Sequence, residues 1–267
     1  MPSNYTADDA RAYERLMGRW SAGLAKLLVD FAGLEAGDRV LDVGCGTGSL
    51  ALELAARAEP AAIIGVDIAV PYVNYAALRS ADPRLNFRAG DATLLDWPPG
   101  SFDRCLSLLA LNFMSDPARA LAAMRRVTRV GGVIAAAVWD FRGGLVYQRI
   151  FWDTAAALDP EADRARGRHY SSPLTGPGQL VHAFRGSGLG DVAACSLTIR
   201  MKYRDFDDYW APIAGAQGPV GDYVRSLAAD RLELLAAGVR RAYLAGGADG
   251  PRSMAATAWA ARGVVPD

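Results

Sequence analysis

The sequence has few cysteines, and those it has lie far apart. Cys45, Cys105 and Cys195 are the only three among 267 residues, and no C-x-x-C pair occurs. This number and spacing disfavour a disulfide framework and a zinc site. We therefore expect no metal and a reducing compartment such as the cytoplasm.

An excess of charge of one sign is also missing. The 29 basic and 29 acidic residues cancel, and they form no block of like charge. Nothing therefore predicts an electrostatic surface for nucleic acid or anionic lipid. The expected partner is a small molecule.

Neither an export signal nor a membrane span is predicted. The first residues, MPSNYTADDARAYERL, are polar and acidic where a secretory signal needs a cationic start and an apolar run. Apolar stretches such as AAIIGV and GGVIAAAVW are far shorter than the roughly 20 residues that span a bilayer. They are instead typical of buried strands.

What the sequence does contain is an alternation of strands and helices. Runs that are apolar on both faces predict strands at 39–43, 61–68, 85–89, 102–109 and 131–139. Helical spacing occurs at 48–58, 70–80 and 118–130, and an earlier helix capped by Ser21 ends at Gly33 or Gly37. This order predicts a doubly wound α/β fold, a parallel sheet between helix layers.

The second half of the chain is less regular. Helices are predicted at 145–158, 179–185, 206–213 and 221–245, and strands at 192–203 and 253–265. The first two of these helices are joined by DPEADRARGRHYSSPLTGPGQ, whose polar, glycine- and proline-containing sequence predicts a long loop. Because loops of this length are usually lids or mobile segments, we expect a lid here.

The stretch VLDVGCGTGSLA, residues 40–51, places a glycine-rich turn between a strand and a helix. Dinucleotide-binding turns have the pattern G-x-G-x-x-G, but Ser49 stands at the last position. Nucleoside-triphosphate loops need a lysine after the final glycine, and none follows Gly48. The turn therefore disfavours a nicotinamide dinucleotide and excludes a nucleoside triphosphate.

Two aspartates stand where the next two strands end. Asp67 follows the second strand and Asp91 the third, at the carboxyl edge of the sheet where open α/β proteins bind ligands. One carboxylate can accept hydrogen bonds from ribose hydroxyls and the other from the exocyclic amine of adenine. A dehydrogenase pattern supplies only the first acid, so the pair favours a different nucleoside ligand.

These motifs together resemble those of class I S-adenosylmethionine-dependent methyltransferases. VLDVGCGTG is similar to the first motif of that family, GVDIA to the second, GDAT to the third, SFDRCLSLLALNFMSDP to the fourth-strand motif, and RVTRVGGVIAAAVWD to the helix and strand that follow. More loosely, YERLMGRWS, FDDYWAPI and AWAARG resemble segments of a bacterial small-molecule branch. The resemblance implies a Rossmann-like sheet of seven strands, with the last strand antiparallel beside the fifth and helices on both faces.

The resemblance also implies which residues bind S-adenosylmethionine and its product S-adenosylhomocysteine. The methionine moiety would lie on Gly44, Cys45 and Gly46, and its amino group would meet the backbone carbonyl of Leu108. The nucleoside would meet four further residues, with Asp67 at the ribose, Asp91 and Ala92 at the adenine, and Ile68 on the adenine face. This cofactor has no phosphate, so the turn needs no lysine, and the helix start at Gly48 favours its carboxylate.

The expected single domain has four parts. Residues 1–37 form an amino-terminal helical cap, and 38–140 form the cofactor-binding core. Residues 141–190 form a substrate-side lid insertion with a returning helix, and 191–267 supply the last strands and helices. Whether the protein is a monomer or a homodimer stays open.

Residues outside the motifs are further candidates, one for the cofactor and the others for the lid and the acceptor side. Arg19 is expected to pair with the methionyl carboxylate, with Tyr13 and Trp20 as lid residues. His169 is a candidate general base near pH 7, and Asn112 a polar residue facing the acceptor. Aromatic side chains that suit an apolar acceptor are Trp139, Tyr147, Trp152, Tyr170 and Trp210.

The predicted function is methyl transfer from S-adenosylmethionine to a small molecule. An NAD(P)-dependent oxidoreductase is one alternative, disfavoured by Ser49 and by the second carboxylate. A non-catalytic module that binds S-adenosylmethionine is the other, since the sequence assures no catalytic base.

Overall fold

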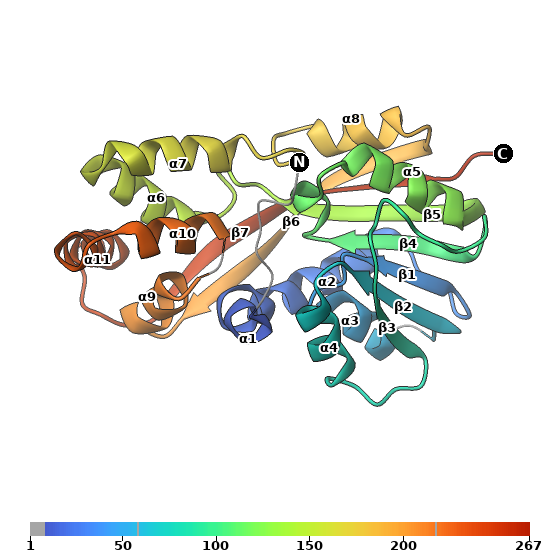
Figure 1. The fold of residues 1–267 in the computed structure, drawn as a ribbon, viewed down its shortest axis with the longest axis horizontal. Helices are drawn as coiled ribbons and strands as arrows, with labels where there is room; N and C mark the ends of the chain where they lie inside the picture. The colour runs from blue at the N-terminus through green and yellow to red at the C-terminus, as the bar shows by residue number, and fades with distance from the viewer. Residues whose placement is uncertain (1–8, 58, 217) are drawn as a thin grey trace.

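A computed structural model describes residues 9–57, 59–216 and 218–267 of the chain (Figure 1). Its centre is a sheet of seven strands in the order β3-β2-β1-β4-β5-β7-β6. The strands are β1 (Arg39–Val43), β2 (Ala62–Asp67), β3 (Leu85–Ala89), β4 (Phe102–Leu108), β5 (Thr128–Trp139), β6 (Gly190–Tyr203) and β7 (Arg252–Val264). The pairs among β1 to β5 are parallel, whereas β7 is antiparallel to both β5 and β6. The predicted doubly wound sheet, with the last strand antiparallel beside the fifth, is confirmed.

Helices cover both faces of the sheet, which is why most residues of its central strands are apolar. Val40 packs in one core cluster with α2 (Arg19–Ala32) and α3 (Ser49–Arg57). Its neighbour Leu41 packs in the other cluster with α5 (Pro117–Val127) and α8 (Gln179–Gly186). Successive side chains of a strand point to opposite faces, so a strand buried on both sides has no polar alternation.

The amino-terminal helix begins earlier than the sequence predicts. α1 (Ala10–Tyr13) continues through a π-helical turn, η1 (Glu14–Gly18), into α2. The cap is Asp9, whose side chain accepts a hydrogen bond from the Ala12 amide at 2.9 Å. Ser21 lies inside the helix and donates to the Met17 carbonyl at 3.2 Å, so its predicted capping role is wrong. Gly33 ends α2 at φ +68°, as predicted, and the first eight residues of the predicted cap lie outside the described residues.

Most of the predicted loop at 159–179 is helix. α7 (Pro160–Tyr170) follows α6 (Val146–Leu158), with Asp159 as N-cap accepting from the Glu161 amide at 2.9 Å. Proline at the first helical position and acidic residues in the first turn favour this start. The composition that predicted a loop is therefore that of an exposed, salt-bridged helix, and the structure supplies no support for a lid there.

The remaining helices gather beyond the ends of β6 and β7, at the left of Figure 1. They are α9 (Phe206–Ala214), α10 (Gly218–Ser226) and α11 (Ala229–Leu244), with α11 packed on α6 and α10 on α7. The long helix predicted at 221–245 is thus two helices. Two shorter elements lie nearer the start of the chain. α4 (Val70–Ala77) packs on β2 and β3, and a short 3-10 turn, η2 (Leu111–Phe113), follows β4.

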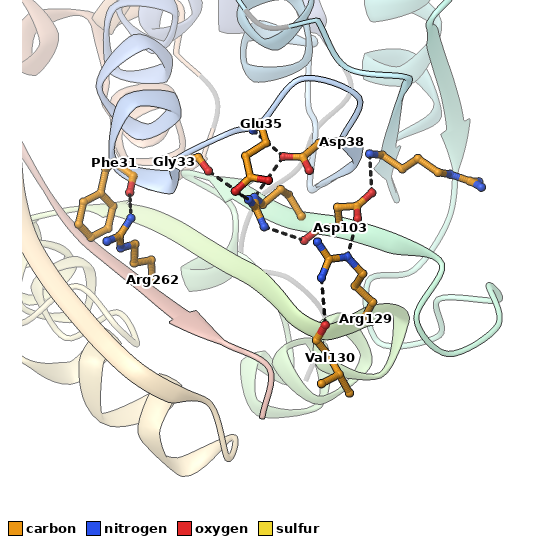
Figure 2. A network of polar contacts seen from close by, with 10 residues as sticks. Phe31, Gly33, Glu35, Asp38, Asp103, Arg129, Val130 and Arg262 are labelled. Atoms are coloured by element: carbon orange, nitrogen blue, oxygen red, sulfur yellow. Dashed lines mark hydrogen bonds and ion pairs between the residues drawn. The ribbon is translucent and has the colours of Figure 1, made fainter. Parts of the chain in front are cut away.

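Charged side chains join the amino ends of the strands, away from the strand ends that carry the glycine turn (Figure 2). Arg104 on β4 is 4% exposed, and its Nε lies 3.2 Å from a carboxylate oxygen of Asp38. Asp103 accepts from the Arg39 amide at 2.9 Å and from Arg129 Nε at 2.6 Å. These contacts tie β1, β4 and β5 together at one edge and leave the other edge for a site.

Candidate functional site

A cavity of ≈ 450 Å³ opens at the carboxyl ends of β1, β2 and β4. Its position coincides with the place where the strand order reverses, since β1 has β2 on one side and β4 on the other. Open α/β sheets bind ligands at such a switch point, because the loops leaving neighbouring strands diverge there.

The glycine turn forms the floor of this cavity. Gly44, Gly46 and Gly48 have φ values of +74°, +52° and +88°, a region that favours glycine. A Cβ atom on Gly44 would lie 2.3 Å from the Cβ of Ala110, so this position excludes any side chain. The Gly44 and Cys45 amides both donate to the Val66 carbonyl, at 2.8 and 3.0 Å, which fastens the turn to β2.

Three of the four predicted turn residues line the cavity. They are Gly44, Cys45 and Gly46. Gly48 is not among the lining residues; a Cβ there would lie 3.1 Å from Ala76 and 3.2 Å from the Phe87 ring. Glycine is therefore needed at position 48 for the positive φ and for close packing against α4 and β3. The alternating glycine pattern alone does not distinguish these roles from contact with a ligand.

The two predicted nucleoside carboxylates reach the same cavity. Asp67 accepts from the Gly46 amide at 2.9 Å and from the Ala69 amide at 2.8 Å, while burial raises its pKa. Asp91 is exposed and accepts from the Thr93 amide at 2.7 Å. Ala92 and Ile68 also line the cavity, and Ile68 is 73% exposed, an unusual position for so apolar a side chain.

A third carboxylate, Asp42 on β1, is one that the sequence reasoning missed. It is wholly buried, lines the cavity, and neither of its oxygens makes a hydrogen bond of normal geometry. Burial, with the charge of Asp67 adding to it and the Ala51 amide partly opposing it, raises the pKa of Asp42 to about 8. In the sequence, the sign of this site was a single acidic residue within the apolar run 40–43.

The acceptor side of the cavity contains some of the predicted aromatic residues and not others. Leu108, Trp139 and Tyr147 line it. Trp152 is fully buried and packs edge-on against Phe151, and neither Tyr170 nor Trp210 is a lining residue. The structure therefore does not bring these three to the cavity, because aromatic residues on α6, α7 and α9 pack mainly between helices.

His169 lines the cavity, but it is a buried imidazole and not a base that titrates near pH 7. It lies near the end of α7, is 7% exposed, and stacks on Phe141 with ring centroids 4.1 Å apart. Its Nε2 lies 2.7 Å from Oε1 of Gln148, a lining residue that sequence reasoning missed. Burial lowers the pKa of His169 to about 4, so it does not titrate near pH 7.

Two other candidates are not brought to the cavity. Asn112 is buried in η2 and is not a lining residue. Arg19 is not one either: its Nη1 lies 2.9 Å from an oxygen of Asp208, and its guanidinium lies 4.3 Å from the Trp20 ring centroid. Tyr13 and Met17 line the cavity from the same amino-terminal segment, while Trp20 packs on Tyr203.

Neither a candidate metal site nor a candidate membrane span is present among the described residues. No group of three or more histidine, cysteine, aspartate or glutamate side chains is placed to hold a metal ion. No helix in the described part of the chain is long and apolar enough to cross a membrane.

Known proteins are similar to this chain in both sequence and fold. Residues 41–136 match a family model described as a methyltransferase domain. A demethylmenaquinone methyltransferase of Roseiflexus castenholzii is 31% identical over 197 residues, which cover 68% of this chain and 82% of that protein.

Two further relatives are matched over about half of their length. A ubiquinone/menaquinone biosynthesis C-methyltransferase of Bdellovibrio bacteriovorus is 37% identical over 113 residues, 41% of this chain and 47% of that protein. A 27-O-demethylrifamycin SV methyltransferase of Amycolatopsis mediterranei is 32% identical over 166 residues, 61% of this chain and 56% of that protein. The names of these relatives differ in the atom that is methylated.

A solved structure with the same fold is phosphoethanolamine N-methyltransferase 2 of Haemonchus contortus, in complex with S-adenosylhomocysteine. It has a TM-score of 0.62 at 18% identity and covers 97% of this chain and 57% of that chain. The YcgJ protein of Bacillus subtilis has a TM-score of 0.59 at 18% identity and covers 92% and 99%. At these identities the likeness shows the fold alone.

Proposed function

Because the chain belongs to the class I S-adenosylmethionine-dependent methyltransferase family, we propose that its cavity binds S-adenosylmethionine and that the protein methylates a small molecule. The observation that carries this proposal is the convergence of the glycine turn, Asp67 and Asp91 on one cavity at the switch point of the sheet.

The residues at the cavity suit the parts of this cofactor. Gly44 to Gly46 allow the methionine chain to approach the backbone, and the Leu108 carbonyl can accept from its ammonium group. Asp67 faces the ribose hydroxyls, and Asp91 the adenine amine, with Ala92 and Ile68 beside the base. Ile68 gives the clearest fit, because an adenine ring would cover its exposed apolar surface.

The unpartnered carboxylate of Asp42 fits the positive charges of the cofactor. An ionised carboxylate in a dry site is stable only with a compensating charge or good hydrogen bonds. The described residues supply no cation and only the weakly placed Ala51 amide. A ligand carrying an ammonium and a sulfonium group would supply that charge. The pyrophosphate of a dinucleotide would instead bring negative charge to a cavity that already has three aspartates, which favours the methyltransferase over the oxidoreductase.

The chemistry required of the protein is mainly alignment. When bound, S-adenosylmethionine supplies an electrophilic methyl group on sulfur. The residues of this chain then hold the acceptor in line with that group and exclude water, and such positioning can contribute about 7–11 kcal/mol. His169 and Gln148 are the polar lining residues on the acceptor side that could position the acceptor.

Calorimetric titration tests the proposed binding. We expect S-adenosylhomocysteine to bind and NAD not to bind, and we expect Asp91→Ala to weaken the affinity for S-adenosylhomocysteine about 10-fold through loss of a hydrogen bond. Asp96→Ala is the matched control, since Asp96 is an exposed acid of the same loop that does not line the cavity. Binding of NAD alone, or equal effects of the two variants, would contradict the proposal.

We also propose a cytoplasmic location and a small-molecule acceptor. The three separated cysteines support a cytoplasmic location. The balanced charge supports a small-molecule acceptor over nucleic acid.

A further inference from the structure

Beyond the proposed cofactor residues, the cavity continues into an apolar region. We call the part lined by Phe113, Met114, Trp139, Phe141, Ile213 and Val220 the acceptor chamber. Among the described residues no arginine or lysine lines the cavity, and its charged residues are three aspartates on the cofactor side. An acceptor with a carboxylate or phosphate would meet no cation here, whereas an uncharged apolar acceptor would bury its surface favourably.

One polar pair stands in the acceptor chamber. His169 on α7 and Gln148 on α6 both line the cavity, and the imidazole Nε2 lies 2.7 Å from the amide Oε1. Gln148 Nε2 in turn donates to the Tyr147 hydroxyl at 3.0 Å. The ring of Phe141 stacks on the imidazole and holds its plane. Two helices and a loop thus fix one histidine in one orientation.

The orientation of Gln148 selects a tautomer of His169. An amide oxygen only accepts hydrogen bonds, so the imidazole nitrogen that faces it, Nε2, carries the proton. Nδ1 then holds the free lone pair. No described residue donates a hydrogen bond to Nδ1. Because the imidazole lines the apolar cavity, this lone pair is suited to the hydroxyl of a ligand.

Resting on the function proposed above, we propose that Gln148 positions His169 so that Nδ1 takes the proton from an uncharged, largely apolar acceptor that carries a phenolic or enolic hydroxyl. In this step the hydroxyl oxygen forms a bond to the methyl carbon, and the methyl–sulfur bond breaks with its electron pair left on sulfur. The hydroxyl proton moves to Nδ1, and the positive charge lost by sulfur is carried by the imidazolium. The reaction needs no other reagent.

The low basicity of His169 is compatible with this role. Burial lowers its pKa, and no charged group contributes to the shift; the side chains packed on the imidazole are Phe141, Trp152, Tyr170 and Gln148. A hydroxyl proton becomes far more acidic as its oxygen bonds to the methyl carbon, so a weak base suffices. A base with a pKa of about 4 is also neutral, and ready to accept, at every pH above 5.

Nitrogen-15 NMR of histidine tests the tautomer without cofactor or activity. The chain has two histidines, and His182 is exposed on α8, so His182→Gln leaves one signal set that belongs to His169. We expect a protonated Nε2 and an unprotonated Nδ1, unchanged from about pH 8 to 5.5. Gln148→Leu should give a mixture of tautomers. A protonated Nδ1, or titration near pH 6.5, would overturn the positioning role.

Methyl-labelled S-adenosylmethionine tests the acceptor class. The panel is a set of apolar scaffolds that each carry a phenol, an enol, an amine or a carboxylate. We expect label on oxygen of the phenol or enol members, with His169→Gln lowering kcat about 10²–10⁴-fold and His182→Gln leaving it unchanged. Label on amine, carbon or carboxylate, or on no hydroxyl member at all, would overturn the inference.

The variants of Gln148 separate positioning from folding. Gln148→Leu should lower kcat about 10-fold while KM and the affinity for S-adenosylhomocysteine stay within about 2-fold. Gln148→Glu keeps the acceptor oxygen and should restore kcat at high pH, but its charge raises the pKa of His169 and adds an acid limb to the pH profile. A rate that falls in both variants with no such limb would contradict the role. Binding of S-adenosylhomocysteine without this behaviour refutes only the inference, whereas absence of binding refutes the proposed function.

Discussion

At the scale of single residues, burial strongly shifts the protonation of Asp42. Its carboxyl lies inside β1 with no hydrogen bond of normal geometry, and its pKa rises from 3.8 to about 8 because burial disfavours the charged form. The protein without ligand therefore holds a proton at neutral pH that the unfolded chain releases. We expect two consequences, one for stability and one for binding.

The first consequence is a stability that falls with pH. A group with a raised pKa in the folded state contributes stability at pH values below 4, and this contribution is lost as pH rises through about 8. Asp42→Asn removes this titration. The natural protein should therefore lose about 3–4 kcal/mol of unfolding free energy relative to this variant between pH 5 and pH 8. Urea unfolding at several pH values measures the difference, and a gap that is constant with pH would refute the assignment.

The second consequence is a binding step that releases a proton. If Asp42 ionises against the ammonium group of S-adenosylhomocysteine, binding at pH 7 releases up to one proton per site, visible by calorimetry as a dependence on buffer ionisation enthalpy. Asp42→Asn should abolish that release and weaken binding about 10- to 100-fold. The same substitution would thus stabilise the fold and impair the site.

At the scale of elements, hydrogen bonds and an ion pair connect the π-helical turn η1 to the glycine turn. The Thr47 hydroxyl donates to Glu14 of η1, and Arg79 reaches both the Glu14 carboxylate at 3.2 Å and the Thr47 carbonyl at 2.9 Å. A Cβ on Gly18 would lie 2.3 Å from the Glu14 carboxylate, so glycine at this position lets that side chain pass. π-helical turns are frequent at functional sites, and this one covers the cavity with Met17.

Removing this fastening should loosen the cover of the cavity. Glu14→Ala is expected to raise amide hydrogen exchange over residues 10–20 and to weaken binding of S-adenosylhomocysteine about 3- to 10-fold, since partly exposed charged contacts contribute about 1 kcal/mol. Arg15→Ala, an exposed neighbour on the same turn, is the control. Equal exchange in the two variants would show that Glu14 does not hold the segment.

The elements also show where sequence patterns reach their limit. Strands β1, β2, β4 and β5 were predictable because most of their residues are buried or partly buried, which leaves largely apolar runs. β3 has no fully buried residue and was predicted from its place in the alternation of strands and helices. α7 was not, because a helix whose buried residues are only Ala162 and His169 has no apolar stripe to detect. Gln148 was missed for a related reason: its role comes from a partner 21 residues later on another helix, and nothing local marks it.

At the scale of the whole molecule, stability and binding are placed at opposite edges of the sheet. The buried Arg104–Asp38 pair belongs to the polar network at the amino ends of the strands (Figure 2). The cavity lies at the carboxyl ends. Arg104→Met leaves Asp38, which is 5% exposed, without its cation and should lower the free energy of unfolding by about 3–5 kcal/mol.

A matched substitution separates the buried pair from an exposed one. Arg129→Met breaks the pair with Asp103, in which Arg129 is 46% exposed, and should cost less than about 1 kcal/mol. Both variants should bind S-adenosylhomocysteine as the natural protein does while folded. An affinity that falls together with stability would show that the two edges are coupled.

The site as a whole was partly predictable. The residues that converge on the cavity from the strand ends, such as Asp67 and Asp91, follow a motif at the sheet edge. Gly48 belongs to the same motif, yet it packs close to Phe87 instead of lining the cavity. Arg19, expected at the cofactor from the amino-terminal segment, pairs with Asp208. Sequence spacing places a residue on an element, but tertiary neighbours decide what its side chain meets.

A crystal structure with S-adenosylhomocysteine tests the central proposal most directly. We predict the homocysteine chain on Gly44 to Gly46 with its ammonium near Asp42, the ribose hydroxyls on Asp67, and the adenine beside Asp91 and Ile68. The sulfur should then face the acceptor chamber that contains His169. A ligand bound elsewhere, or with its sulfur turned away from that chamber, would contradict the proposal.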